Sequence, residues 1–281
     1  MNHIKSSINL CNISQTGKNI RIVILDSGVY QHTDLEGRII VFKDFINRYR
    51  IPYDDNGHGT HISGIICGLG TACKGKYTGI SQGAELIVLK VLDKNGNGKT
   101  NDFINALKWV IENKQRYNIR LLNFSVGFIS RTNLYDKKLI LDLINQIWDD
   151  GIIVVTAAGN NGPDDNTITV PGISRKVITV GAIGEKFSGR GPTECCIVKP
   201  EVLAPGSNIT SLRNKYNEYI AKSGTSMATP VVCGALALAL EKNETLRPID
   251  AKLALYNSVD QTEDDVLCWG NLNVKKLIDY V

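Results

Sequence analysis

Cysteine provides no structural framework in this chain of 281 residues. Its seven cysteines follow no recurring spacing and form no C-x-x-C pair, which excludes a zinc ribbon and a thioredoxin-type motif. We expect free, buried thiols, as is typical of proteins in a reducing compartment. Cys67 and Cys73 could pair across a loop, but no recurring spacing favours that pairing.

Long hydrophobic runs are also missing. No stretch approaches the roughly 18 apolar residues of a membrane span, and the run at 231–240 has the length of a buried helix. No apolar run follows the N-terminus as it does in a signal peptide. We therefore expect no membrane partner. A cytoplasmic protein is expected if Met1 is the native start, and a secreted one if a signal peptide and a prodomain have been removed.

Charge of one sign is not in excess. The 32 Lys and Arg residues against 28 Asp and Glu give a net charge of +4. The densest basic stretch, at 108–120, does not interleave aromatic residues in the way that a nucleic-acid platform requires. We interpret it as the solvated face of a helix, and we expect a monomer that does not bind nucleic acid.

Short apolar runs alternate with helical segments along the chain. The expected strands lie at 20–25, 86–91, 119–124, 152–156 and 177–180. One expected helix begins near His58, and the others cover 101–113, 135–148, 225–240 and 248–256. This alternation predicts an α/β fold, a three-layer sandwich with a mostly parallel central sheet. Residues 18–281 would form one domain, preceded by a short N-terminal arm at 1–17.

Polar residues follow several of the expected strands directly. Asp26, Ser125 and Asn160 each come just after such a strand. Functional groups of parallel sheets gather at the carboxyl ends of the strands and on the loops there. The sequence therefore predicts that these three residues lie at one edge of the sheet.

Three motifs supply a carboxylate, an imidazole and a hydroxyl: LDSG at 25–28, HGTH at 58–61 and SGTSMATP at 223–230. Serine is a poor nucleophile unless a base takes its proton, and the base needs a third group to orient it. Asp26, His58 and Ser226 are the candidates for these roles. A fourth motif, AAGN at 157–160, offers the amide of Asn160 to an oxyanion, together with the N–H of Ser226 at a helix start.

Each motif also has another interpretation. His58 and His61 could ligate a metal, but no nearby Glu or Cys completes a zinc set. Ser226 could be a helix cap. The run GKT at 98–100 lacks the first glycine of a phosphate loop, since Asp93 stands there. An α/β-hydrolase would need the order Ser, Asp, His, which differs from the order Asp, His, Ser found here.

Taken together, in the order Asp, His, Ser, these motifs make the chain similar to the subtilisin-like serine peptidases, or subtilases. The similarity extends from the residues at 16–18 to those at 269–273, and includes KVL at 90–92 and KPEVLAPG at 199–206. It implies a subtilisin-like fold and a serine endopeptidase that works through an acyl-enzyme. By this resemblance Asp26 orients the base, His58 is the base and then the acid, Ser226 is the nucleophile, and Asn160 completes the oxyanion hole.

The resemblance also implies how a polypeptide substrate is held. One edge would pair with the substrate backbone through Ser125, Val126 and Gly127, and an opposing segment would be formed by Asn95, Gly96, Asn97 and Gly98. Gly127 and the residues Ala157, Ala158 and Gly159 would form the walls of the first specificity pocket, with Thr169 near its base. Pro171 matches a position that is cis in the family. The small, neutral walls suit an apolar side chain, whereas Asp164 and Asp165 could favour a basic one.

The chain departs from the family at its calcium sites and its N-terminus. The loop at 70–79 lacks the asparagine-rich calcium loop of the secreted enzymes, although Asp34 matches one ligand. Cys195 stands where a second site would place a carboxylate. We expect no tight calcium site, no other metal and no cofactor. Members of this family usually carry an N-terminal prodomain, whereas residues 1–17 are all that stand before the domain in this sequence. We expect either that the prodomain is missing from this chain or that this is a cytoplasmic member that folds without one.

Other roles stay open at this point. The chain could be a latent enzyme or a pseudopeptidase that binds peptides without cleaving them, although all four catalytic candidates are present. It could also be a dedicated peptidase that removes leader peptides.

Overall fold

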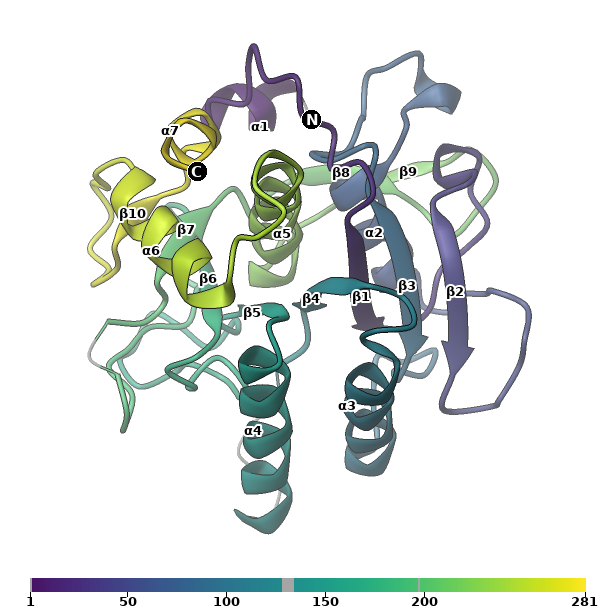
Figure 1. The fold of residues 1–281 in the computed structure, drawn as a ribbon, viewed down its shortest axis with the longest axis horizontal. Coiled ribbons are helices and arrows are strands. Elements are labelled where there is room, and N and C mark those ends of the chain that lie inside the picture. Colours follow the sequence, from purple (N-terminus) through teal and green to yellow (C-terminus); the bar gives the residue numbers. More distant parts are fainter. Residues whose placement is uncertain (1, 128–133, 197) are drawn as a thin grey trace.

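The computed structural model describes residues 2–127, 134–196 and 198–281, and its centre is an eight-stranded sheet (Figure 1). The strands lie in the order β10-β7-β6-β5-β4-β1-β3-β2, and all neighbouring pairs are parallel. Their bounds are β1 Arg21–Asp26, β2 Ile39–Asp44, β3 Glu85–Lys90, β4 Ile119–Phe124, β5 Ile153–Ala157, β6 Ile178–Ala182, β7 Val202–Ala204 and β10 Gly270–Asn271. A separate antiparallel hairpin joins β8, Ile209–Leu212, to β9, Tyr219–Lys222.

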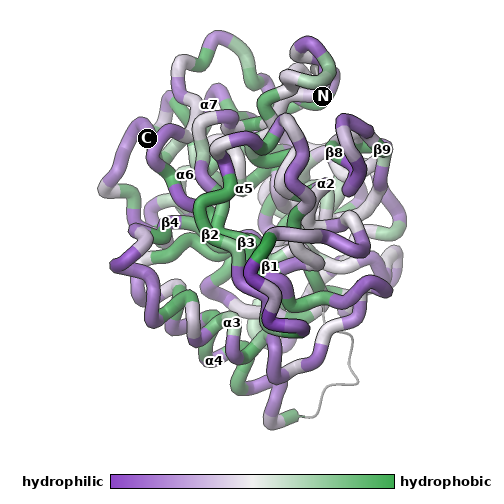
Figure 2. The backbone as a smooth tube through the Cα atoms, turned by 90° about the vertical axis from the view of Figure 1, so that its right-hand side faces the viewer, coloured by the Kyte–Doolittle hydropathy of each residue, from purple (hydrophilic) through white to green (hydrophobic). Residues whose placement is uncertain are grey.

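The central strands are apolar because they are buried on both faces. Val23 of β1 pairs with Ile87 of β3 on one side and with Leu122 of β4 on the other, and all three are fully buried. A parallel strand covered on both sides needs a continuous apolar run rather than an alternating one. Figure 2 shows hydrophobic segments running through the interior and hydrophilic ones along the outer loops.

Helices cover both faces of the sheet (Figure 1). On one side α2, His58–Cys67, contacts α5, Thr225–Lys242, and on the other α3, Thr100–Asn113, contacts α4, Leu134–Asp149. Towards the C-terminus, α6, Pro248–Ser258, packs on α7, Val274–Tyr280. The predicted three-layer α/β fold is confirmed.

The expected elements match the observed ones closely. Each of the five predicted strands and each predicted helix is present, with its ends shifted by at most two residues. The edge strands β2 and β10, the strand β7 beside β10, the hairpin and the short helices are additional. The edge strand β2 is only partly buried, so its sequence carries a weaker strand signal than the central strands do.

The N-terminal residues pack onto the same core. Helix α1, Asn2–Ser7, buries Ile4, and the carbonyl of buried Ile8 accepts the N–H of Val274 at 2.8 Å, which places the two ends of the chain side by side (Figure 1). The carboxylate of Glu241 on α5 accepts the backbone N–H groups of residues 16–18 at 2.6, 2.5 and 3.1 Å. The segment before β1 is thus fixed at both of its ends.

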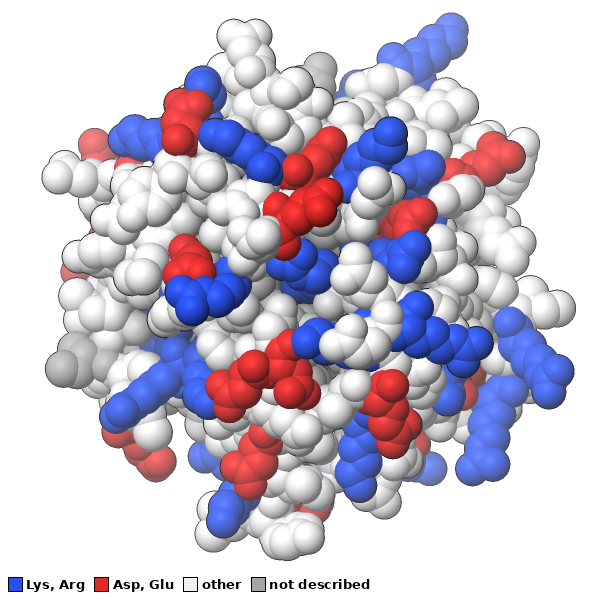
Figure 3. Space-filling model, viewed as in Figure 1, with Lys and Arg blue, Asp and Glu red and all other residues white. Residues whose placement is uncertain are grey.

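The surface charges are mixed, as the nearly balanced composition leads one to expect. Acidic and basic side chains are interspersed on the face drawn in Figure 3.

All seven cysteines lie in the described part of the chain and are free, but only Cys67 and Cys233 are buried, so the expectation of buried thiols holds for two of them. Among the described helices, none has both the length and the apolar character that a bilayer crossing requires.

Candidate active site

The carboxyl end of β1 and the start of α2 bring Asp26 and His58 into contact. Asp26 is the last residue of β1 and is fully buried, and His58 is the first residue of α2. Nδ1 of His58 lies 2.8 Å from Oδ1 and 2.9 Å from Oδ2 of Asp26. The N–H of Ser27 donates to Oδ1 of Asp26 at 2.7 Å, which fixes the carboxylate. The second nitrogen of the imidazole is left to act on another group.

The start of α2 is held by Asp54, whose buried carboxylate accepts five hydrogen bonds. Oδ1 accepts the hydroxyl of Ser27 at 2.8 Å and the N–H groups of Asn56 and Gly57 at 3.1 and 2.7 Å. Oδ2 accepts the N–H and the hydroxyl of Thr60 at 2.9 and 2.6 Å. The first N–H groups of a helix have no partner within the helix. Asp54 supplies an acceptor for the N–H of Thr60, in the first turn of α2. Through its bond to Ser27, it also links this turn to the residue that follows Asp26.

Ser226 lies at the start of α5, as the second residue of the helix, after Gly224 and Thr225. Its hydroxyl donates to the carbonyl oxygen of Ser125 at 2.8 Å, just beyond the end of β4. Ser125 is itself held, because its hydroxyl accepts the side-chain amide of buried Asn123 at 2.8 Å. The structure therefore joins Asp26 to His58, and Ser226 to Ser125.

The amide of Asn160 is oriented by the residue before Ser226. Oδ1 of Asn160 accepts the N–H and the hydroxyl of Thr225 at 2.9 and 3.1 Å. Nδ2 is the end that a side chain at Gly224 would meet, 3.3 Å from the position of its Cβ. With its oxygen bound in this way, Asn160 keeps two N–H donors at the edge of the site.

The loop between β3 and α3 forms a tight turn around Asp93. Its carboxylate accepts the N–H groups of Asn95 and Asn97 at 2.8 and 2.9 Å, and the Asp93 N–H donates to the Asn97 carbonyl at 2.8 Å. The amide of Asn56, two residues before His58, donates to the carbonyl of Lys94 at 3.1 Å. This turn contains the predicted binding residues at 95–98 and attaches them to the His58 segment.

The predicted pocket residues also come together. The side chain of Thr169 lies against both Gly127 and Gly159, and its N–H donates to the carbonyl of Ala158 at 3.0 Å. Ala157 ends β5 beside them and is buried with Ala158. The peptide bond before Pro171 is cis, as expected.

Two carboxylates and one ammonium group set the charge state of His58. Burial lowers its pKa, but the charge and hydrogen bond of Asp26, with a further contribution from Asp54, raise it, and the pKa ends above its usual value. The positive charge of Lys222, on β9, acts in the opposite direction. Burial lowers the pKa of His61 to about 3, and its Nε2 lies 3.0 and 3.1 Å from carbonyls of the β8–β9 hairpin. His61 is therefore a structural residue.

Asp34, the matched calcium ligand, has protein partners on both carboxylate oxygens. The N–H of Ala72 donates to Oδ1 at 2.8 Å, and the hydroxyl of Tyr219 donates to Oδ2 at 2.7 Å. The described residues contain no cluster of three or more His, Cys, Asp or Glu side chains able to hold a metal ion. The absence of a tight calcium site stays a prediction.

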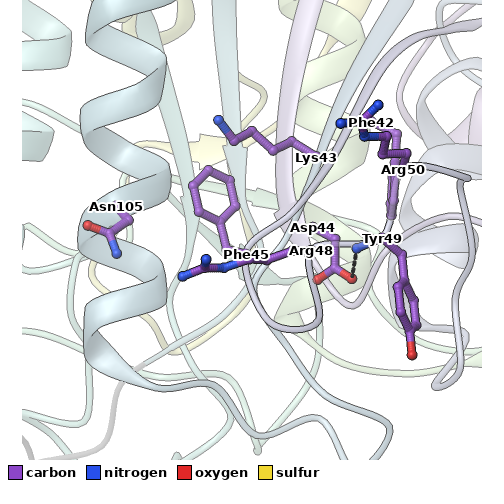
Figure 4. A pocket seen from close by; sticks show the side chains of 8 residues that line it. All are labelled: Phe42, Lys43, Asp44, Phe45, Arg48, Tyr49, Arg50 and Asn105. Atoms are coloured by element: carbon purple, nitrogen blue, oxygen red, sulfur yellow. Dashed lines mark hydrogen bonds between the residues drawn. The ribbon is translucent and has the colours of Figure 1, made fainter.

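A separate hollow of about 490 Å³ lies beside β2 and contains none of the predicted site residues. Asp44 faces it, and its carboxylate accepts the N–H groups of Ile46, Asn47 and Tyr49 and the hydroxyl of Tyr53 (Figure 4). These bonds shape the loop that follows β2. The carboxylate of Asp44 is therefore a structural group rather than a free acid.

Sequence reasoning missed three residues of the site: Asp54, Lys222 and Thr225. Asp54 stands three residues before Gly57, the N-cap of α2, so the usual search for an acidic cap directly before a helix does not find it. Thr225 and Lys222 stand one and four residues before Ser226. Their partners lie far away in the sequence, so only the folded chain identifies them.

Comparisons with known proteins find clear similarity to one family. Residues 17–270 match the model of the subtilase family. The chain is 40% identical over 279 residues to serine protease AprX of Bacillus subtilis, covering 89% of this chain and 63% of that protein. It is 32% identical over 251 residues to subtilisin DY of Bacillus licheniformis, covering 88% and 86%. Its fold is similar to that of a solved psychrophilic protease, S41, with a TM-score of 0.83, 28% identity and coverage of 96% and 97%. The chain thus spans less than two thirds of the length of AprX.

Proposed function

Because this chain belongs to the subtilase family, we propose that it is a serine endopeptidase that hydrolyses polypeptides through an acyl-enzyme. The observation that carries the proposal is the contact of Asp26 with His58, together with Ser226 at the start of a buried helix beside Ser125. An oriented imidazole and a nearby hydroxyl at a helix N-terminus are what acyl transfer requires.

In the proposed reaction Ser226 turns its hydroxyl from the Ser125 carbonyl towards Nε2 of His58. The Ser226 oxygen then forms a bond to the substrate carbonyl carbon while His58 takes the proton. As the C–N bond breaks, His58 gives this proton to the leaving amine. Water repeats the sequence on the acyl-enzyme, with its proton passing through His58, and releases the acid and free Ser226. Asp26 holds the imidazole and stabilises its charged form.

The negative charge that develops on the substrate oxygen needs donors fixed in advance. Asn160 is the proposed side-chain donor, because Thr225 binds its oxygen and leaves its N–H groups available. The N–H of Ser226, in the first turn of α5, is the proposed second donor. We expect Asn160→Ala to lower kcat about 100- to 1000-fold, the range that loss of such a donor costs in subtilisin.

The proposed substrate groove combines the segments at 125–127 and 95–98. The backbone of an extended peptide would pair with these edges, which gives affinity that depends little on sequence. The identity of the natural polypeptide, the absence of a cofactor and the place where the enzyme works stay predictions.

The direct test is labelling with a fluorophosphonate probe, which reacts with activated serines. We expect the wild-type protein to be labelled and Ser226→Ala not to be. Ser223→Ala, which removes an exposed hydroxyl three residues earlier, is the matched control and should be labelled like the wild type. Labelling that persists in Ser226→Ala would place the nucleophile elsewhere. A folded wild-type protein that is neither labelled nor cleaves peptides would instead indicate a latent enzyme or a peptide-binding module.

A further inference from the structure

We propose that Thr169 fills the first specificity pocket and restricts cleavage to bonds that follow a small residue, namely glycine, alanine or serine. This inference rests on the proposed peptidase activity and adds a substrate class to it. The resemblance at the sequence level placed Thr169 near the base of a pocket and left apolar and basic side chains open. The contacts of Thr169 in the folded chain favour neither large apolar nor basic residues.

The side chain of Thr169 occupies the space between the two walls. A Cβ added to Gly127 would lie 2.3 Å from Oγ1 and 2.8 Å from Cβ of Thr169. A Cβ added to Gly159 would lie 2.6 Å from Cγ2 and 2.8 Å from Oγ1 of the same residue. Since a Cβ is about 1.5 Å from its Cα, the backbone of each wall is already near van der Waals contact with Thr169. A side chain placed between the two glycines would therefore meet Thr169.

Thr169 cannot easily turn away from this position. Its N–H donates to the carbonyl of Ala158 at 3.0 Å and its hydroxyl donates to the same oxygen at 3.4 Å, so both backbone and side chain are anchored to the segment after β5. The residue is buried, and a β-branched side chain has few χ1 alternatives. The filled pocket is therefore a fixed feature rather than one of several side-chain arrangements.

The consequence for the substrate concerns the residue just before the cleaved bond. Its side chain would enter between the segments at 127 and 159 and would meet Thr169. A hydrogen or a methyl group needs little depth, whereas a leucine, phenylalanine or lysine side chain needs the space that Thr169 fills. Asp164 and Asp165 are exposed and lie on the loop five and four residues before Thr169. A basic side chain that enters between the segments at 127 and 159 would meet Thr169 like any other long side chain.

The test compares tetrapeptide p-nitroanilides that differ only in this residue, with alanine, leucine, phenylalanine or lysine. For the wild-type enzyme we expect kcat/KM for alanine to exceed that for phenylalanine at least tenfold. Thr169→Gly opens the pocket and should raise kcat/KM for phenylalanine at least tenfold relative to alanine. Thr169→Ser removes only the methyl group and should give a smaller change in the same direction.

Thr167→Gly is the matched control, because it makes the same substitution two residues earlier in a side chain that bonds Asp164 and Arg190 rather than the pocket walls. Its preference should equal that of the wild type. Fluorophosphonate labelling of each variant shows independently whether the serine is active. A wild-type enzyme that cleaves after phenylalanine as fast as after alanine overturns the inference. So does an unchanged ratio in labelled Thr169→Gly and Thr169→Ser. A wild-type protein that is not labelled by the fluorophosphonate would contradict the proposed peptidase activity itself.

Discussion

Asp54 is the residue whose removal tests the architecture of the site most directly. Replacing its carboxylate with an amide in Asp54→Asn keeps the shape of the side chain but leaves one acceptor oxygen in place of two. Five hydrogen bonds now end on this carboxylate. If the retained oxygen keeps Ser27, Asn56 and Gly57, the new NH2 group faces two donors of Thr60.

The expected loss of stability follows from that count. A buried donor left without an acceptor costs about 1–3 kcal/mol, so two such donors predict a loss of about 2–6 kcal/mol in the free energy of unfolding. That is a large fraction of the roughly 5–15 kcal/mol that a typical domain has. Urea denaturation measures it as a lower midpoint at an unchanged slope.

The same substitution should alter the pH dependence of the reaction. His58 must be neutral to accept a proton, so kcat/KM rises as the pH rises through its pKa. Asp54 contributes to raising this pKa, and its neutralisation should move the acid limb of the kcat/KM profile to lower pH. The turn that carries His58 also loses its cap, so we expect a lower kcat at the pH optimum.

Asp142→Asn is the matched control for Asp54→Asn, because it makes the same chemical change at an exposed position of α4. Its effect on the free energy of unfolding should stay within about 0.5 kcal/mol, and its pH profile should not move. If Asp54→Asn were as stable as this control and its acid limb did not shift, the capping and electrostatic roles given to Asp54 would both be wrong.

Two further predictions concern charges. Lys222→Met removes a positive charge that lowers the pKa of His58, so the acid limb of kcat/KM should move to higher pH, opposite to the shift in Asp54→Asn; an unmoved limb would contradict this. Glu201→Gln weakens a buried ion pair with Lys199, whose ammonium lies 2.8 Å from the carboxylate. It should cost about 3–5 kcal/mol and lower the melting temperature, whereas Asp279→Asn in an exposed pair should cost under about 1 kcal/mol.

The order of the strands and helices could be predicted because a strand that is buried on both faces has a continuous run of apolar residues in the sequence. The strand at 119–124 is buried almost throughout and reads as an apolar run. The hairpin strand β8 includes Thr210 and Ser211 and is stabilised partly by distant bonds, such as the one from the Ser211 hydroxyl to the carbonyl of His61 at 2.8 Å. That bond joins residues 150 positions apart, and no local pattern in the sequence records it.

The candidate site, too, could be predicted from the sequence only in part. The residue types and their order predict which groups do chemistry, because a carboxylate, an imidazole and a hydroxyl have few other uses in such motifs. The sequence does not contain the distances between them. That the Ser226 hydroxyl rests on the Ser125 carbonyl, and that Thr169 fills the gap between two glycines, are consequences of how β4, β5 and α5 pack.

The contact between Asp26 and His58 depends on a backbone approach that the sequence shows only in part. A Cβ on Gly59 would lie 2.1 Å from the carbonyl oxygen of Gly28 and 3.2 Å from Cβ of Asp26. Alanine would favour the helix by about 1 kcal/mol over glycine, yet at 2.1 Å from a backbone atom it would force α2 away from β1. Gly59 is therefore unfavourable for the helix itself, but it allows α2 to approach the segment after β1 closely. Because the two backbones touch here, Nδ1 of His58 reaches a carboxylate that lies fully buried at the end of its strand.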